Sequence, residues 1–222
     1  MGSQNKVNQL DDLIHYFELK KIPKDTQFVV QPKCDGISLE IIYQNGKLVE
    51  AITRGDGHIG DIITQNVVKM KNCVPQINDD FSGAVRCEIV MLNQDFEKLN
   101  QITQKNSDKD FYSNSRNAAS GISQRLDGQY SEFCSLYSVD TYSTSHTFAT
   151  ETEKIDFLKK HKFTTVDNFL CTNFDQVENI YQQFLIKDRE KYSFEIDGLV
   201  IKINDLKLQH QLGSKNNRPK GQ

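Results

Sequence analysis

Apolar residues along the chain follow two spacings, and each spacing predicts one kind of element. They recur three or four positions apart over residues 6–20, which predicts an amphipathic helix that ends before Pro23. The same spacing predicts further helices around residues 60–71, 93–105, 115–126, 151–161, 174–186 and 204–213. Short alternating or continuous apolar runs predict strands within "TQFVVQPK", "SLEIIYQ", "KLVEAIT", "VRCEIVM", "SLYSVDTY" and "EIDGLVIKI".

The order of these elements indicates the fold class. The runs "SLEIIYQ" and "KLVEAIT" are joined by Asn45-Gly46, a dipeptide that favours a two-residue hairpin turn. Strands and helices mix without a regular strand–helix–strand repeat. We therefore expect an α+β fold of mainly antiparallel sheets flanked by helices, not a doubly wound parallel sheet. No internal repeat or low-complexity linker interrupts the sequence, which we interpret as one continuous domain.

Composition narrows the class of protein. The 222 residues are 37% hydrophobic and 26% charged with a net charge of −3, and no block of basic residues suggests a nucleic-acid-binding tail. The apolar runs are far too short to span a membrane, and the N-terminus is polar, so we expect a cytoplasmic protein without a membrane partner. The five cysteines are odd in number and contain no CxxC pair, which favours reduced thiols over a disulfide framework or a cysteine zinc site.

One lysine stands out in a strand that is otherwise apolar. Lys33 lies in "QPKCDG", two residues before an Asp-Gly turn. Its stem can extend to water, which is the simpler interpretation. The alternative is chemical, because a lysine held at the edge of a pocket can act as a nucleophile when its amine is neutral. Partial burial and neighbouring cations both favour the neutral amine.

Other charged residues follow the same strand-and-turn pattern. Arg54 precedes the glycine-rich turn "GDGHIGD", and Glu88 lies inside the strand "VRCEIVM". In "EIDGLVIK", a regular strand would put Asp197 on one face and Lys202 on the other, unless a bulge near Gly198 changes the phase. Each of these motifs alone is weak, and their order along the chain carries the signal.

The ordered blocks "QPKCDG", "TRGDGHIGD", "VRCE", "SRNAASG" and "FEIDGLVIK" resemble the adenylylation domain of the NAD-dependent DNA ligases. The resemblance runs from about Asp25 to Gln222, which leaves residues 1–24 as an N-terminal helical segment. It implies a nucleotidyltransferase (ATP-grasp-like) domain and a DNA ligase activity. In that activity, a lysyl-AMP forms from NAD, and the AMP then passes to the 5′-phosphate of nicked DNA.

The resemblance also implies roles for particular residues. Lys33 would be the nucleophile and Lys202 a second catalytic lysine. The nucleotide would be bound by Gln31, Lys33, Arg54, Glu88 and Lys202, with Glu88 on the ribose and Gln31 near the adenine. Tyr137 is our candidate for the aromatic residue that stacks on the adenine.

Three further expectations concern phosphates, metal and the pocket wall. Arg116 and Asn117 occupy family positions near the nick or the phosphates, and Glu195 and Asp197 would help to hold Mg²⁺. Cys87 stands where the family has a glycine, so we expect it to narrow the nucleotide pocket.

Two parts of the family pattern have no counterpart in this sequence: a module for the nicotinamide mononucleotide half of NAD, and a strand with a final catalytic lysine after "RPKG". The adenylylation domain at 25–222 thus reads as truncated before its last lysine-bearing strand. A shortened chain, a degenerate paralogue and a split phage-type ligase are three explanations. We favour the third, with nicked double-stranded DNA and a second ligase subunit as partners. That subunit would carry the lysine strand and an oligonucleotide-binding domain.

Two alternatives remain open for the activity. The lysine chemistry is shared with ATP-dependent and RNA-joining nucleotidyltransferases, so the AMP donor is either NAD or ATP. A non-catalytic nucleotide- or DNA-binding paralogue is an alternative of a different class. The intact set of Lys33, Arg54, Glu88 and Lys202 favours an enzyme, because a decayed module would be expected to lose some of them first.

Overall fold

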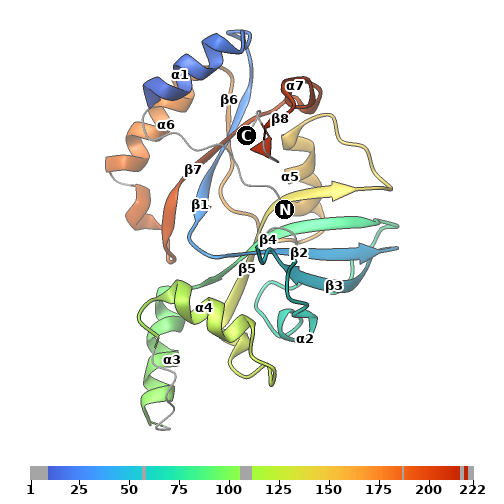
Figure 1. The fold of residues 1–222 in the computed structure, drawn as a ribbon, viewed down its shortest axis with the longest axis vertical. Helices are drawn as coiled ribbons and strands as arrows, with labels where there is room; N and C mark the ends of the chain where they lie inside the picture. The colour runs from blue at the N-terminus through green and yellow to red at the C-terminus, as the bar shows by residue number, and fades with distance from the viewer. Residues whose placement is uncertain (1–9, 57–58, 106–111, 187, 216–217, 220–222) are drawn as a thin grey trace.

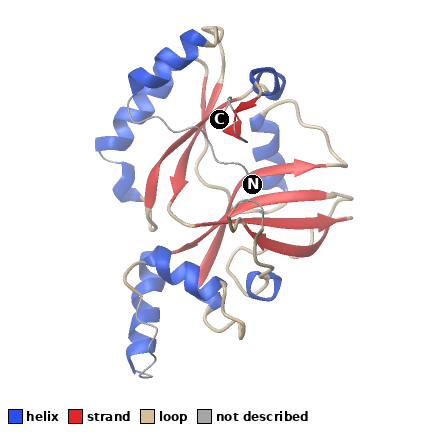
Figure 2. Cartoon of the chain, viewed as in Figure 1, coloured by secondary structure: helices blue, strands red, loops and turns tan. Residues whose placement is uncertain are grey.

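The computed structural model describes residues 10–56, 59–105, 112–186, 188–215 and 218–219. Its strands form two main antiparallel sheets, in the orders β6-β1-β7 and β3-β2-β4-β5 (Figures 1 and 2). All named strand pairs in these sheets are antiparallel, which confirms the predicted α+β class. No helix in the described part of the chain is long and apolar enough to cross a membrane.

The first sheet is covered on one face by two helices that are far apart in the sequence. Its strands are β1 (Phe28–Cys34), β6 (Phe169–Cys171) and β7 (Ile196–Ile203), and the helices are α1 (Leu10–Leu19) and α6 (Phe174–Ile186). Phe17 of α1 stacks on Phe28 at 5.1 Å between ring centroids and meets Phe174 of α6 edge-on at 5.6 Å. The predicted N-terminal helix therefore packs into the same core as the sheet, next to α6 (Figure 1).

One face of the second sheet is buried under helices. Its strands are β2 (Ile37–Gln44), β3 (Lys47–Thr53), β4 (Gly83–Met91) and β5 (Cys134–Ser143). The helices that contribute to this core are α2 (Thr64–Val67), α3 (Asn93–Lys105), α4 (Ser115–Ser123) and α5 (Glu151–Lys160). Leu39, Ile41, Val85, Cys87 and Ile89 alternate along β2 and β4 on the buried face, as a half-buried antiparallel sheet requires.

The remaining elements are short. They are the 3₁₀ turns Ser131–Phe133 and Asp188–Lys191, the helix α7 (Leu206–Leu212), and the strands β8 (Ser214–Lys215) and β9 (Arg218–Pro219). Asp205 caps α7, because its carboxylate accepts from the Leu208 N–H at 2.8 Å. Gly213 ends that helix with φ +69°, as predicted.

Two local predictions differ from the structure. The helix predicted over 60–71 contracts to Thr64–Val67, because the amides after Val68 bond three residues back: Lys69 N–H to the Asn66 carbonyl and Met70 N–H to the Val67 carbonyl. The apolar spacing still predicts which side chains of this segment face the core, since Val67 and Met70 are buried. Strand β6 was not predicted, because three residues are too few to show a period. The Asn45-Gly46 hairpin is confirmed, with positive φ at both residues.

Candidate active site

Three of the predicted site residues share one face of the first sheet. In the β1–β7 ladder Gln31 opposes Val200, Lys33 opposes Gly198 and Val29 opposes Lys202, and opposed residues of antiparallel strands point to the same side. Gln31, Lys33 and Lys202 therefore point away from α1 and α6. Lys33 and Lys202 are four ladder positions apart, about 13 Å along the strands.

A bulge brings a carboxylate to Lys33. Lys33 opposes Gly198, but Cys34 opposes Ile196, so Asp197 is the extra residue on β7. Gly198 has φ +156°, a conformation that L side chains rarely adopt. The phase change near Gly198 that the sequence left open is confirmed, and the Lys33 Nζ donates a hydrogen bond to Asp197 Oδ2.

The turn that follows Lys33 joins the two sheets. The Asp35 N–H donates to the Glu195 carbonyl at 2.8 Å, which extends the pairing with the residues before β7. A Cβ on Gly36 would lie 2.5 Å from the carbonyl oxygen of Ile89, closer than real Cβ atoms approach. The Asp-Gly step therefore lets β2 start directly against β4, which fixes Lys33 at the junction of the two sheets.

Glu88 lies on the polar face of the second sheet, close to the same junction. It opposes Ser38 in the β2–β4 ladder, and the Ser38 hydroxyl donates to Glu88 Oε1. Burial raises the pKa of the Glu88 carboxyl, whereas the Ser38 hydrogen bond and the charges of Lys33, Arg116 and Arg86 lower it. The electrostatic interactions with Lys33 and Arg116 indicate that residues from β1, β4 and α4 are close together here.

Helix α4 contributes Arg116. Asn114 caps the helix, since its side chain accepts from the Asn117 N–H at 2.7 Å. Arg116 Nη1 then reaches Asp35 Oδ1 at 2.6 Å. The Asn117 side chain instead donates to Ser113 Oγ at 2.9 Å and stays on the exposed surface of the helix start.

Arg54 and Tyr137 border the same region. Arg54 follows β3 and is exposed, and its backbone N–H donates to the Ser38 carbonyl at 3.0 Å. Tyr137 opposes Glu88 in the β4–β5 ladder, so it lies on the polar face, and its ring centroid is 4.8 Å from that of Phe194. The structure therefore brings Arg54, Glu88 and Tyr137 to one sheet face.

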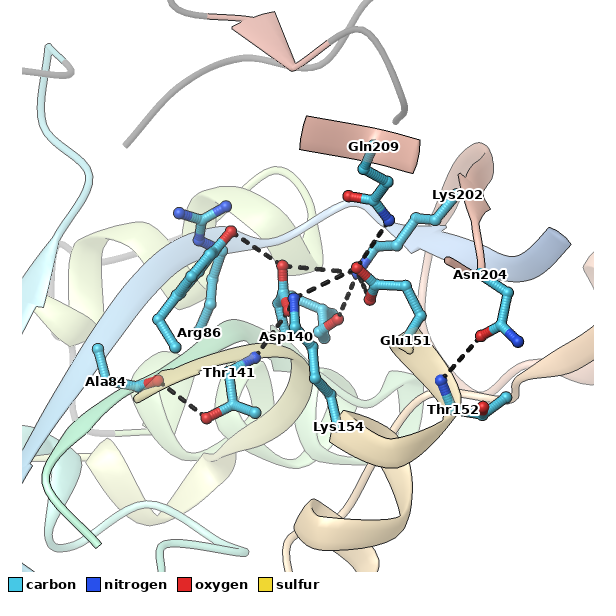
Figure 3. A network of polar contacts seen from close by, with 12 residues as sticks. Ala84, Arg86, Asp140, Thr141, Glu151, Thr152, Lys154, Lys202, Asn204 and Gln209 are labelled. Atoms are coloured by element: carbon cyan, nitrogen blue, oxygen red, sulfur yellow. Dashed lines mark hydrogen bonds and ion pairs between the residues drawn. The ribbon is translucent and has the colours of Figure 1, made fainter. Parts of the chain in front are cut away.

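Lys202 lies in a different environment from Lys33. Its side chain is 3% exposed, and its Nζ donates to the Val139 carbonyl at 3.0 Å and to Glu151 Oε2 at 3.3 Å (Figure 3). Val139 is the extra residue of a bulge in β5, which turns its carbonyl towards Lys202. Asp140 Oδ2 lies 3.7 Å from the Lys202 Nζ.

A second lysine completes this buried network. The Lys154 Nζ lies 3.0 Å from Asp140 Oδ1 and 3.2 Å from Glu151 Oε1, so two ammonium groups face two carboxylates. Gln209 of α7 donates to Glu151 at 2.9 Å (Figure 3). Burial raises the pKa of Asp140, but the charges of Lys202 and Lys154 outweigh it and bring that pKa to about 2.

Gln31 lies at the edge of the same interior region. Its side chain is buried and donates to Asn168 Oδ1 at 2.6 Å. In the interior between the sheets, Gln31 and Asn168 lie beside Val139, Asp140, Glu151 and Lys154, with no room for a water molecule. The candidate adenine residue and the Lys202 network are therefore neighbours in a closed part of the interior.

Comparison with known proteins identifies the family. The family model for the NAD-dependent DNA ligase adenylation domain matches residues 1–221. The chain belongs to this family. A DNA ligase of Campylobacter jejuni (strain RM1221) is 34% identical over 212 residues, which cover 92% of this chain and 32% of that protein. A DNA ligase of Francisella philomiragia subsp. philomiragia is 35% identical over 229 residues, covering 99% of this chain and 33% of that protein. The chain spans about a third of the length of these relatives.

A solved structure supports the fold. The structure named "Pmar-Lig_Pre." has a TM-score of 0.52 and 12% identity, and the match covers 85% of this chain and 41% of that one. At this identity the likeness concerns the fold alone. Together with the family match, it confirms the nucleotidyltransferase fold that the ordered motifs implied.

One expectation from the family pattern is wrong. Cys87 does not narrow the nucleotide pocket, because it opposes Leu39 on the face of β4 that points away from Glu88. It is buried in the core and contacts Ser138 Oγ at 3.4 Å. All five cysteines are free thiols, as predicted.

Several contacts of this adenylation domain were not predicted. Some residues that no motif singled out form hydrogen bonds or ion pairs with a predicted site residue or within the Lys202 network. They are Ser38, Asp140, Glu151 and Lys154. Asp35 was inside a recognised motif, and its position before Gly36 was a usable signal for a structural role.

Proposed function

We propose that this adenylation domain forms a lysyl-AMP at Lys33 with NAD as the AMP donor, and passes the AMP to the 5′-phosphate of nicked DNA. The observation that carries the proposal is the placement of the Lys33 Nζ at the sheet junction, in contact with Asp197 and within electrostatic range of Glu88. The Lys33 side chain is 48% exposed, so a nucleotide can reach it. Family membership supports NAD as the donor.

The chemistry uses the Lys33 amine as a nucleophile. Its Nζ attacks the α-phosphorus of NAD, a nitrogen–phosphorus bond forms, and the bond from phosphorus to the bridging oxygen breaks. That oxygen leaves with its electron pair on nicotinamide mononucleotide. The amine must first lose a proton, and Asp197 is the carboxylate in hydrogen-bond contact with it. In the next step a DNA 5′-phosphate oxygen attacks the same phosphorus, and Lys33 leaves.

The surrounding side chains supply binding and orientation. Glu88, which accepts a hydrogen bond from the Ser38 hydroxyl, would accept another from a ribose hydroxyl. Arg54 and Arg116 are exposed cations beside the junction, so they suit phosphate oxygens. We propose that the adenine is contacted by Gln31 and Tyr137. The DNA phosphates would be contacted by Arg116 and Asn117.

The carboxylates of Glu195 and Asp197 suit a magnesium ion. Both residues are exposed and offer the oxygen ligands that Mg²⁺ prefers. Bound there with phosphate oxygens and water, the ion would neutralise phosphate charge. Since Asp197 bonds Lys33 in this structure, its carboxylate would be shared between the amine and the metal.

The test is a covalent adduct assay. The chain is incubated with Mg²⁺ and either NAD or ATP, and the intact mass is measured. We expect a gain of one AMP with NAD, located on Lys33 by peptide mass spectrometry and absent in Lys33→Ala. Lys47→Ala is the matched control, because Lys47 is an exposed lysine on β3. An adduct on another lysine would contradict the role of Lys33. An adduct that forms with ATP but not with NAD would show that NAD is not the donor.

Sealing a nick is proposed to need more protein than this chain. The relatives are about three times as long as the matched region, and we infer that their remaining length holds DNA-binding and catalytic groups. A second ligase subunit that carries an oligonucleotide-binding domain is the partner we propose, with the cytoplasm as the compartment. A gel assay on nicked duplex DNA tests this, since full sealing by residues 1–222 alone would contradict it.

A further inference from the structure

We propose that Asp79, Asp80, His146 and His161 form a binding site for a zinc-class divalent cation, separate from the adenylation site. Among the residues that the structure describes, Asp79, Asp80 and His146 offer three ligand atoms that all lie within 4.8 Å of one another. His161 lies next to Asp79 but outside this group of three, so its imidazole would move towards the ion to become a fourth ligand. Two histidines and two carboxylates are a ligand set that suits Zn²⁺.

The distances leave room for a metal between the histidines and Asp79, whose Oδ1 also accepts a hydrogen bond from the Asp80 N–H at 2.7 Å. His146 Nε2 lies 3.4 Å from Asp79 Oδ1, and His161 Nε2 lies 3.5 Å from Asp79 Oδ2. Both separations exceed those of ordinary hydrogen bonds, which are about 2.7–3.2 Å. They match the distance between two ligands of a tetrahedral zinc ion, about 3.4 Å for bonds of about 2.1 Å.

His161 provides the independent observation that points to a ligand. Its side chain is only 6% exposed, and its Nε2 is a buried atom without a hydrogen-bond partner among the described residues. Buried polar atoms in folded proteins are normally satisfied, so an orphaned nitrogen facing a carboxylate is unusual. A cation between His161 and Asp79 would satisfy it.

His146 is held by a neighbouring side chain in the way that metal-binding histidines are. Its Nδ1 lies 2.9 Å from Ser145 Oγ, so the ring can donate from Nδ1 and keep the Nε2 lone pair for a metal. The ring of Phe157 packs against both imidazoles, with its centroid 5.3 Å from that of His146 and 4.5 Å from that of His161. This packing helps to hold His146 next to the two aspartates.

The site lies far from Lys33 in the fold and joins three segments. Asp79 and Asp80 precede β4, His146 follows β5, and His161 follows α5. In the β2–β4 ladder, Glu88 opposes Ser38 near the start of β2, whereas Gly83 opposes Tyr43 near its end. The metal would therefore connect chain segments at the opposite end of the sheet from the adenylation site. His161 also borders a groove of about 490 Å³, which Asp79, Asp80 and His146 do not line.

The experiment uses the 222-residue chain without a histidine tag, dialysed against a chelator. Isothermal titration with ZnCl₂ is expected to show one Zn²⁺ per chain, and the melting temperature is expected to rise with the Zn²⁺ concentration. Asp79→Asn keeps the side-chain volume and should weaken binding at least tenfold, as should His161→Ala. The matched controls His210→Ala and Asp156→Asn change exposed residues outside the cluster and should leave binding unchanged.

Binding that is unaltered by Asp79→Asn would overturn the proposal, as would the absence of stoichiometric binding to the parent chain. If His161→Ala does not fold, Asp79→Asn decides the outcome. The adduct assay is independent, because Asp79 does not contact Lys33 or any residue assigned to the nucleotide.

Discussion

The two lysines that the ordered motifs assign to catalysis lie on the same face of one sheet, yet their surroundings differ. Lys33 is 48% exposed and forms an ion pair with Asp197, which a bulge in β7 presents. Lys202 is 3% exposed and is held by a carbonyl and two carboxylates. Exposure leaves Lys33 available for chemistry, whereas a phosphate that binds Lys202 must compete with Glu151. The proposed site therefore has an exposed half at Lys33 and a buried half at Lys202 that also holds the fold together.

The largest expected effect on stability comes from the buried half. Glu151→Ala removes a carboxylate that faces two ammonium groups, so that Lys154 and Lys202 must share the negative charge of Asp140. Breaking a buried ion pair by removing one partner costs about 3–5 kcal/mol, so we expect the free energy of unfolding in urea to fall by that amount. Glu178→Ala, an exposed change on α6, should stay within about 0.5 kcal/mol. A loss below 1 kcal/mol for Glu151→Ala would contradict a structural role for the network.

The next effect concerns nucleotide affinity at the exposed half. Glu88→Ala removes the carboxylate proposed for the ribose, and a hydrogen bond to a charged group contributes about 1.5–3 kcal/mol. We expect a ten- to hundredfold weaker affinity for AMP by calorimetry, with little change in the binding of Glu132→Ala, an exposed control. Unchanged affinity in Glu88→Ala would remove this residue from the site.

Sequence reasoning recovered the parts of the fold that depend on local pattern. The Asn45-Gly46 hairpin, the helices at 151–160 and 174–186, and the strands that carry Lys33, Glu88 and Lys202 all follow from spacing and turn chemistry. The contact between Lys33 and Asp197 did not follow, because a single inserted residue reverses which face a side chain occupies.

The buried network was outside the reach of local pattern for a different reason. Asp140, Glu151 and Lys154 lie about 50 to 60 positions before Lys202 in the chain, and each alone looks like an ordinary charged residue of a strand or helix. Only the packing of α5 and β5 against β7 brings their charges together. The same holds for Ser38, whose bond to Glu88 depends on the β2–β4 register.

The two halves should also differ in their response to acid. The pKa of Asp140 is lowered to about 2 in the folded protein, below the value near 3.9 of an unfolded chain. Its stabilising contribution is therefore present above about pH 4 and is lost as the pH falls towards 2, a change of about 2 kcal/mol. Glu88 acts in the opposite direction, because its pKa is raised and protonation favours the folded state.

The measurement for this prediction is the unfolding free energy of wild type and Asp140→Asn from pH 5 to pH 2. The difference between the two proteins should shrink by about 2 kcal/mol as the pH falls. A difference that stays constant would show that the Asp140 carboxylate is not the titrating group. Asp156→Asn is the control for surface acids, because Asp156 is an exposed carboxylate of α5 outside the buried network.

The smallest expected effect on stability comes from the ion pair between Arg116 and Asp35, which tests whether the exposed half contributes less than the buried network. The pair is short at 2.6 Å, but the two side chains are 54% and 32% exposed, so water and salt screen it. A double-mutant cycle with Arg116→Ala and Asp35→Ala should give a coupling free energy of about 0–1 kcal/mol in urea unfolding. The rate of adduct formation should nevertheless fall in Arg116→Ala, because the guanidinium is proposed to bind phosphate. A coupling above about 2 kcal/mol would place this pair with the buried network, outside the range of exposed ion pairs, and the contrast between the two halves would fail.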